Sequence, residues 1–448
     1  MSPPGNTHQL LQLIGIPPHY GVSRLRVLLW TQWRARCHAV GVDASNARCR
    51  AVACLALLLG SLLLTSCATL PRNPVPAAQV AWAAVPGMPD VRGWAGRPNR
   101  DMELDFERSL RDERPEDFPV AADGRIHYPH LALSGGGANG AFGAGFLNGW
   151  TATGTRPTFK IVTGVSTGAL MAPYVFLGPD YDEALRVFYT TTTNADVFSA
   201  GNPLLALLRR ESLAQTAPLE SLIASAIDAR LLAKIAAGHR AGRRLYMGTA
   251  DLDSRHFVVW NMGLIATRES PEALALFRRV MLASASIPIA FPPVLIEVEA
   301  HGKRYDEMHV DGFVAANIFL HAGIIDPQRI YNRMSRAPAT YDAFMIHNGQ
   351  LAAASDPAER SLRGIAFRTI EVAGRAGMIG DLFREYAYAR RDNARFAWVT
   401  IDSGLDLPEA TSFDPAQMKV LYDVGYQRAR AGPVWLSRPP GMTAADAP

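Results

Sequence analysis

The sequence predicts an α/β fold in which a central, mostly parallel sheet is flanked by helices. Three observations lead to this prediction. Short apolar runs alternate with segments of helical periodicity over residues 126–434. Two of these runs end in glycine-rich turns that lead into helices, as in βα units. The length of this region suits one large α/β domain rather than two.

The N-terminus has the pattern of a secretory signal. Residues 51–64 are almost unbroken apolar sequence, preceded by two arginines and ending in Leu64-Thr-Ser-Cys67, which resembles a bacterial lipobox. The run is shorter than the ~20 residues that a membrane-spanning helix needs. We therefore expect residues 1–66 to be a signal segment, with residues 1–40 the product of a start codon assigned too early. Cys67 would then be the lipid attachment site; the alternative is a buried helix with an incidental cysteine.

Charge and cysteine usage set this segment apart from the rest of the chain. Residues 1–67 hold six arginines and one acidic residue, which leaves 39 basic and 40 acidic residues for the mature chain. A nearly neutral mature chain argues against a nucleic-acid partner. All four cysteines lie at or before position 67, so no cysteine metal site or redox pair remains. Because alanine rather than aspartate follows Cys67, we expect a lipid-anchored protein of the bacterial cell envelope, in the outer rather than the inner membrane.

Beyond the signal, the chain divides into three regions. Residues 67–125 are rich in Pro, Ala and Gly and are expected to form a tether followed by a charged helix. Residues 126–434 are expected to form the α/β domain, and residues 435–448 a disordered tail. The leucine-rich stretch Val197–Ala236 is interpreted as core helices or as a cap over an acyl-binding groove.

Periodicity places the individual elements of the domain. Apolar runs bounded by turn residues predict strands at Tyr128–Ser134, Phe159–Val165, Arg244–Ala250, Phe257–Asn261, Met308–Asp311, Ala343–His347 and Ala397–Ile401. Helical spacing predicts helices at Met102–Arg114, Ala141–Trp150, Gly168–Phe176, Asp182–Thr190, Leu219–Ala236, Glu272–Ala283 and Pro415–Arg430. The strands that flank the polar turn 251–255 are expected to form a hairpin at one side of the sheet.

The first glycine-rich turn, Ser134-Gly-Gly-Gly-Ala-Asn-Gly140, separates a strand from a helix. Consecutive backbone N–H groups at a helix N-terminus can hold a phosphate or the oxyanion of an acyl-transfer intermediate. The residues expected to face the anion are Gly135, Gly136, Gly137, Asn139 and Gly140. Their spacing also matches a dinucleotide-binding turn, but the acidic residue expected ~20 positions later is absent, as is a Gly-Lys-Ser/Thr sequence. Nucleotide binding is therefore disfavoured.

The second turn, Gly164-Val-Ser-Thr-Gly168, has the form of a nucleophile elbow. Gly164 and Gly168 allow a turn so tight that it lifts the Ser166 hydroxyl clear of the sheet. A serine hydroxyl needs a base. Asp311, at the end of a short strand and followed by Gly312, can accept the Ser166 proton and return it to the leaving group if the two side chains meet. These motifs together indicate a serine acyl hydrolase.

These motifs, in this order and with Ala283-Ser-Ala-Ser-Ile-Pro-Ile-Ala-Phe-Pro-Pro293, resemble the patatin-like phospholipase family over about Tyr128–Arg430. The resemblance implies a patatin-like α/β/α sandwich and a Ser–Asp dyad, with Ser166 as nucleophile and Asp311 as proton acceptor. It implies that the amides of residues 135–137 form the oxyanion hole. The implied activity is hydrolysis of acyl esters of lipids, of phospholipase A or lysophospholipase type, without a metal or an organic cofactor.

Two positions depart from the family pattern. Asn139 stands where the family often has Arg or Lys, so a cationic helper beside the oxyanion loop is missing. Phe313 stands where the family has Gly or Ala in Asp-Gly-Gly or Asp-Gly-Ala. If that position needs a positive φ, Phe313 is strained; otherwise it lines the pocket.

Two other interpretations of the same residues remain open. An α/β-hydrolase esterase would use a Ser166–Asp311–His347 triad, in the chain order typical of that class. His309 also shares a strand face with Asp311, although we expect both histidines to be structural. A non-catalytic lipid-binding envelope lipoprotein with a decayed pocket is the third possibility, and it would take no covalent serine label.

Overall fold

The computed structural model describes residues 70–200, 212, 214–352, 355–405, 407, 409–432 and 435–443. The expected signal segment, all four cysteines and residues 201–211 of the leucine-rich stretch lie outside the described residues. The chain separates into residues 1–71 and residues 72–448 as two compact units, and the description below concerns the second. Within the described ranges, no helix is both long enough and apolar enough to span a membrane.

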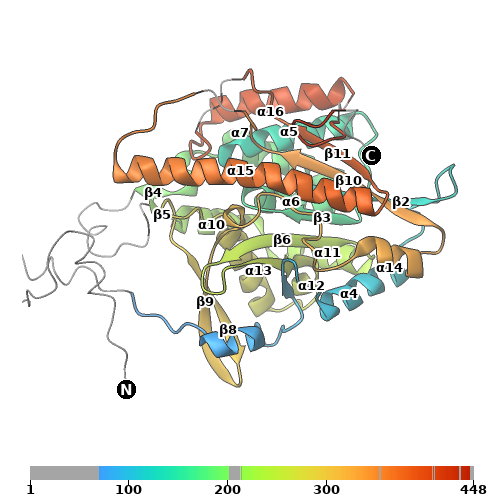
Figure 1. The fold of residues 1–448 in the computed structure, drawn as a ribbon, viewed down its shortest axis with the longest axis horizontal. Coiled ribbons are helices and arrows are strands. Elements are labelled where there is room, and N and C mark those ends of the chain that lie inside the picture. Colours follow the sequence, from blue (N-terminus) through green and yellow to red (C-terminus); the bar gives the residue numbers. More distant parts are fainter. Residues whose placement is uncertain are drawn as a thin grey trace, which may run out of the picture. The chain divides into compact units, whose positions relative to one another are not determined.

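A nine-stranded sheet, largely parallel at its centre, forms the middle of the unit (Figure 1). Its strands are β1 (Arg92–Trp94), β2 (Ile126–Leu133), β3 (Ile161–Gly164), β6 (Arg244–Asp251), β7 (His256–Asn261), β8 (Val294–Ala300), β9 (Lys303–Asp311), β10 (Ala339–His347) and β11 (Arg395–Thr400). The main path runs β1-β7-β6-β3-β2-β10-β11, and β9 pairs with both β6 and β8. β6, β3, β2, β10 and β11 are parallel to one another, whereas β1, β7, β8 and β9 pair antiparallel. The predicted fold class is confirmed.

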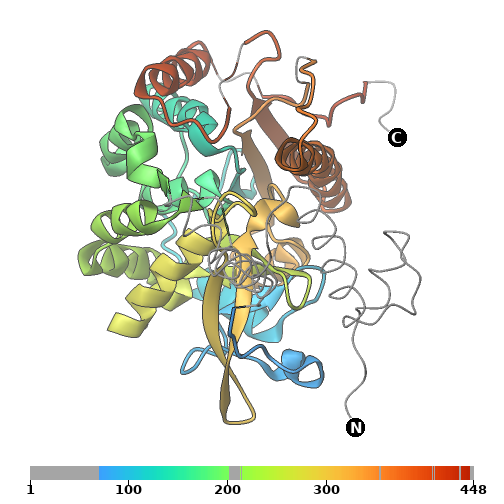
Figure 2. The ribbon, with the colours of Figure 1, turned by 90° about the vertical axis from the view of Figure 1, so that its left-hand side faces the viewer.

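Helices cover both faces of the sheet (Figure 2). They are α4 (Arg100–Arg111), α5 (Gly140–Ala152), α6 (Thr167–Leu177), α7 (Asp182–Thr191), α8 (Asn194–Val197), α10 (Ala217–Ala226), α11 (Ala229–Arg240), α12 (Met262–Ala266), α13 (Pro271–Ser284), α14 (Pro327–Met334), α15 (Leu362–Arg391) and α16 (Pro415–Arg430). α5, α6, α11, α13 and α16 contribute to one apolar cluster, and α4, α14 and α15 to a second. A small two-stranded sheet, β4 (Ser199–Ala200) with β5 (Ala214–Gln215), lies apart from the main one.

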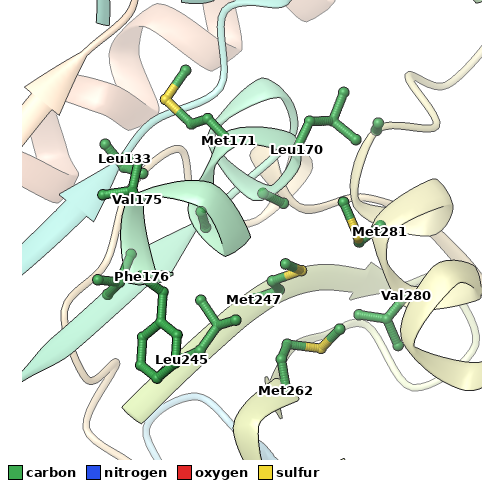
Figure 3. Packing of buried hydrophobic residues seen from close by; sticks show 14 of the residues in the cluster. Leu133, Leu170, Met171, Val175, Phe176, Leu245, Met247, Met262, Val280 and Met281 are labelled. Carbon is green, nitrogen blue, oxygen red and sulfur yellow. The ribbon is translucent and has the colours of Figure 1, made fainter. Parts of the chain in front are cut away.

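The central strands are rich in apolar residues because both of their faces are buried. On β2, Leu131 and Leu133 belong to the first cluster, while Tyr128 and Ala132 belong to the second. Figure 3 shows side chains of α6 and α13 pointing toward those of β6 in the first cluster. α6 is therefore held firmly where it leaves the sheet, which is where Ser166 lies.

Several segments differ from the sequence-based expectation. Residues 72–94, expected as tether, lie against the sheet unit: Arg72 pairs with Asp253 and Asp306, and β1 pairs with β7. Val85, Met88 and Val91 of this segment also join the first apolar cluster. They alternate with Pro86, Gly87 and Pro89, so the sequence showed no helix or strand period there. The single helix expected over Leu219–Ala236 is instead two, α10 and α11, because Asp228 caps a new start.

The C-terminal segment expected to be a disordered tail begins in contact with the sheet. Leu436 forms a β-bridge with Trp398, and Trp398 Nε1 donates a hydrogen bond to the Arg438 carbonyl. Trp435 packs edge-on against Trp150. Trp435 therefore anchors the start of a segment whose prolines otherwise suggest disorder.

Candidate active site

Ser166 lies in a tight turn between β3 and α6. Its φ of 55° is unusual for a residue with a side chain, as expected of a nucleophile elbow. A Cβ on Gly164 would lie 2.3 Å from the Gly168 carbonyl oxygen, and one on Gly168 would lie 2.2 Å from the Leu133 carbonyl oxygen. The turn therefore has room for no side chain at either position.

Ser284, the last residue of α13, is hydrogen-bonded to the backbone of the elbow. Ser284 Oγ accepts a hydrogen bond from the Ser166 N–H at 3.0 Å and donates one to the Gly248 carbonyl at 2.7 Å. Ser284 is fully buried and links β6 to the elbow. It belongs to the segment Ala283–Pro293, but no local pattern distinguished it from its neighbour Ser286.

Asp311 ends β9, where it lies opposite Thr249 of β6, and β6 pairs directly with β3. The following turn brings the aspartate loop against the elbow, since a Cβ on Gly312 would lie 2.9 Å from Val165 Cγ1. Asp311 is completely buried. Its Oδ1 accepts the Phe313 N–H at 3.0 Å, and its Oδ2 has no hydrogen-bond partner among the described residues.

Burial raises the pKa of Asp311 to about 7, because removal from water penalises the charged carboxylate. The Phe313 amide and the Ser166 hydroxyl act on the same carboxylate and lower its pKa, but burial outweighs them. The hydroxyl is thus near the carboxylate, although the pair does not meet the geometry of a formed hydrogen bond in this structure. Ser166 and Asp311, 145 positions apart in the sequence, are brought together.

The triple-glycine loop lies beside the serine. A Cβ on Gly135 would lie 3.1 Å from Ser166 Cβ. The Gly135 N–H donates to the Asn317 carbonyl at 3.3 Å, so it is already engaged. The N–H groups of Gly136 and Gly137 donate to no acceptor in the described part of the chain. Of the three amides expected to hold an oxyanion, these two are available.

Asn139 and Gly140, which follow the three glycines, and Phe313, which follows Asp311, are all in contact with neighbouring elements or buried. Asn139 is buried, and its Oδ1 has no partner among the described residues. Gly140 begins α5, where a Cβ would lie 2.5 Å from Thr167 Oγ1. Phe313 does not have a positive φ and packs beside Gly374 of α15, so the possible strain does not arise.

The two histidines considered as alternatives are bonded elsewhere. His347 Nδ1 lies 2.9 Å from Thr400 Oγ1, and β10, which carries it, is separated from β6 by β3 and β2. Burial lowers the pKa of His347 to about 4. His309 is fully buried, with Nδ1 2.9 Å from Thr249 Oγ1 and Nε2 3.2 Å from Glu307. In the described ranges, no hydrogen bond joins either histidine to Asp311.

One cluster in the described ranges has residue types that can bind a metal: Asp251, Glu307 and His309. Arg92 forms a buried ion pair with Glu307, and both nitrogens of His309 are hydrogen-bonded. Asp251 Oδ1 accepts the Asp253 N–H, so all three residues already take part in contacts within the protein.

Residues 131–324 match the model of the family described as patatin-like phospholipase. No curated protein matches the chain. Among solved structures, VipD from Legionella pneumophila is 12% identical over 70% of this chain and 69% of its own, with a TM-score of 0.34. The type III effector protein ExoU is 14% identical over 69% of this chain and 56% of its own, with a TM-score of 0.20.

Proposed function

Because residues 131–324 form a domain of the patatin-like phospholipase family, we propose that this protein is a serine acyl hydrolase that cleaves acyl esters of lipids. The observation that carries the proposal is the meeting of three parts. Ser166 stands on a strained elbow, the buried Asp311 adjoins it, and the unpaired amides of Gly136 and Gly137 lie on the adjacent loop.

The proposed reaction uses two steps with one base. Asp311 accepts the proton of Ser166 as Oγ attacks the ester carbonyl carbon, and the Gly136 and Gly137 amides stabilise the resulting oxyanion. The tetrahedral intermediate collapses as Asp311 returns the proton to the departing alcohol, which leaves an acyl-enzyme. Asp311 then takes a proton from water, which attacks the acyl group. That intermediate collapses as Asp311 returns the proton to Ser166 Oγ, which releases the fatty acid and restores the serine hydroxyl.

The burial of Asp311 suits the carboxylate to this work. An ordinary carboxylate is a weak base beside a serine hydroxyl, so little proton transfer would occur. With a pKa of about 7, Asp311 is a stronger base that is still ionised in about half of the molecules at neutral pH. The pKa of the serine hydroxyl is still much higher than that of Asp311. Much of the rate enhancement must therefore come from the glycine amides.

Exposed apolar side chains near the site favour a lipid substrate. Val314 is 48% exposed and lies three residues after Asp311. Ile289 is 37% exposed and belongs to the segment in which the Ser286 carbonyl accepts the Asp311 N–H. Side chains of this kind can contact the acyl chain of a lipid, and the substrate class itself rests on the family match. Phospholipase A and lysophospholipase activities both fit this arrangement.

We further propose that a lipid on Cys67 holds the enzyme at its substrate, in the outer membrane. Four residues separate Cys67 from Arg72, whose ion pairs with Asp253 and Asp306 fix it on the sheet unit. An extended chain of that length reaches about 17 Å. The expected anchor is therefore short. Metabolic palmitate labelling of wild type, and loss of the label in Cys67→Ser, would test the anchor.

An ester panel tests the activity, from short nitrophenyl esters to lysophospholipids and intact phospholipids. We expect wild type to hydrolyse at least one ester and to react with a fluorophosphonate probe, and Ser166→Ala to do neither. Asp311→Asn should fold and lose hydrolysis. A wild type that binds lipid vesicles but shows neither hydrolysis nor labelling would instead identify a non-catalytic lipid-binding lipoprotein.

A further inference from the structure

The free N–H of Gly136 can hold an oxyanion only if its peptide plane has a fixed orientation. Gly136 has a φ of 151°, and the adjacent Gly135 and Gly137 have no side chains to restrict rotation. The loop therefore needs outside contacts to fix each plane. Rotation of one plane would turn its N–H away from the substrate and present a carbonyl oxygen, which would repel the anion.

The hydroxyl of Ser134 makes such a contact with the plane that carries the Gly136 N–H. Ser134 Oγ donates a hydrogen bond to the Gly135 carbonyl at 2.7 Å. That carbonyl and the Gly136 N–H share one trans peptide, so the two groups point in opposite directions. Holding the oxygen on one side therefore holds the N–H on the other.

Asn348, directly after β10, keeps the serine hydroxyl in its role as a donor. Its backbone N–H donates to Ser134 Oγ at 2.8 Å, which leaves the hydroxyl proton for Gly135. Its side-chain Nδ2 donates to the Ser134 carbonyl at 3.0 Å. Ser134 and Asn348 are both buried, so this chain of bonds lies away from competing water.

A separate set of contacts fixes the preceding plane. The Asn317 carbonyl accepts the Gly135 N–H, and Asp381 of α15 accepts the Asn317 N–H at 2.6 Å. The plane between Gly135 and Gly136 depends instead on Ser134 for its hydrogen bond. Ser134 is therefore the side chain whose removal frees that plane.

We propose that Ser134 is a positioning residue for the hydrolysis, and that its hydroxyl orients the Gly135–Gly136 peptide so that the Gly136 N–H meets the oxyanion of the transition state. The inference rests on the proposed function and extends it to a residue that does not touch the substrate. Substrate binding does not need this orientation, because the negative charge develops only in the transition state.

The test compares Ser134→Ala with Ser109→Ala on a soluble nitrophenyl ester. Ser109 is a buried serine of α4 whose Oγ donates to the Phe106 carbonyl at 2.7 Å, so it matches Ser134 in burial and in the hydrogen bond that its hydroxyl donates. Active sites are counted with the fluorophosphonate probe, so that kcat refers to intact Ser166. Loss of an oxyanion donor lowers kcat by about 10²- to 10³-fold. A donor that is released rather than removed should have a smaller effect.

We expect Ser134→Ala to lower kcat by about 10- to 100-fold with KM within about twofold of wild type. Ser109→Ala should match wild type, and Ser134→Thr, which keeps the hydroxyl, should recover most of the rate. The pH of half-maximal kcat/KM should not move, because Asp311 is unchanged. If the alanine variant does not fold, Ser134→Cys, with its weaker donor, takes its place under the same criterion.

The possible failures are distinguishable. A wild type that neither hydrolyses esters nor takes the label refutes the proposed function. An active wild type whose Ser134→Ala variant, per labelled site, has the same kcat as Ser109→Ala refutes the positioning role alone. A rise in KM without loss of kcat also refutes it, because it would place Ser134 in ground-state binding.

Discussion

Replacing Asp311 by asparagine is expected to stabilise the fold above pH 7 while abolishing hydrolysis. The wild-type carboxyl is completely buried, and one of its oxygens has no partner among the described residues. Burial raises the pKa of Asp311 from 3.8 to about 7, so the native state holds this proton more tightly than the unfolded chain does. Between these two values, the free energy of unfolding of wild type should fall as the pH rises.

The size of this effect follows from the difference between the two pKa values. Each pH unit between them lowers the free energy of unfolding by about 1.4 kcal/mol, so the whole window corresponds to about 4 kcal/mol. Asparagine has nearly the same shape and no charge to bury. At pH 4, where the carboxyl is largely neutral, Asp311→Asn should be close to wild type. Above pH 7 its advantage should approach 4 kcal/mol, reduced by any rearrangement that lets water reach the carboxylate.

Urea unfolding of both proteins at half-unit intervals from pH 4 to pH 9 measures the difference. Asp423→Asn is a suitable control, because it removes a half-exposed carboxylate paired with Lys419 on α16. The control should change stability by less than about 1 kcal/mol at any pH. A stability difference for Asp311→Asn that does not vary with pH would show that the pKa of Asp311 is the same in the native and unfolded states. That result would remove the reason for treating Asp311 as a strengthened base.

Three further outcomes are expected. The kcat/KM of wild type should fall about tenfold per pH unit below pH 7 and level off above it, because the base must be deprotonated; a flat profile from pH 5 to 9 would contradict this. His347→Gln and His309→Gln should keep kcat per labelled site within about threefold of wild type, whereas a loss of ~10⁴-fold in either would favour a triad. Gly136→Ala should lose at least ~100-fold in kcat, because its Cβ would lie 2.0 Å from the Asn348 carbonyl oxygen. Gly154→Ala is the control: Gly154 also has a positive φ, 72°, but no atom lies within 4 Å of its Cβ position, so this variant should retain activity.

The parts of the site that could be predicted from the sequence are those built from neighbouring residues. Gly164 and Gly168 are required by the turn that they themselves form, so the motif alone identified the elbow. The central strands were also predictable, because burial on both faces makes them rich in apolar residues. Asp311 was found as an aspartate that ends a strand before a glycine. The sequence around Asp311 does not show that this side chain lies near Ser166. The pairing of β9 with β6, and of β6 with β3, brings it there.

The elements that were missed are those with a weak local signal. α15 is a helix of 30 residues in which exposed apolar side chains such as Leu362 and Val372 interrupt the division into a polar and an apolar face. β8 is the exception, because its buried and exposed residues alternate cleanly and its sequence therefore carried a strand signal that the prediction did not use. β1 has three residues, too few to show any period.

The glycine loop shows most clearly where prediction from sequence ends. Three successive glycines suggested three equivalent amides, but the Gly135 N–H is taken by the carbonyl of Asn317, which lies 182 positions away in the chain. Which amides stay free is decided by partners that arrive from distant segments. The same partners restrict the peptide planes that glycine leaves free to rotate. The loop is therefore pre-organised by its surroundings, and in the proposed mechanism its ability to hold an oxyanion depends on buried contacts from Ser134, Asn317 and Asn348 that no short motif contains.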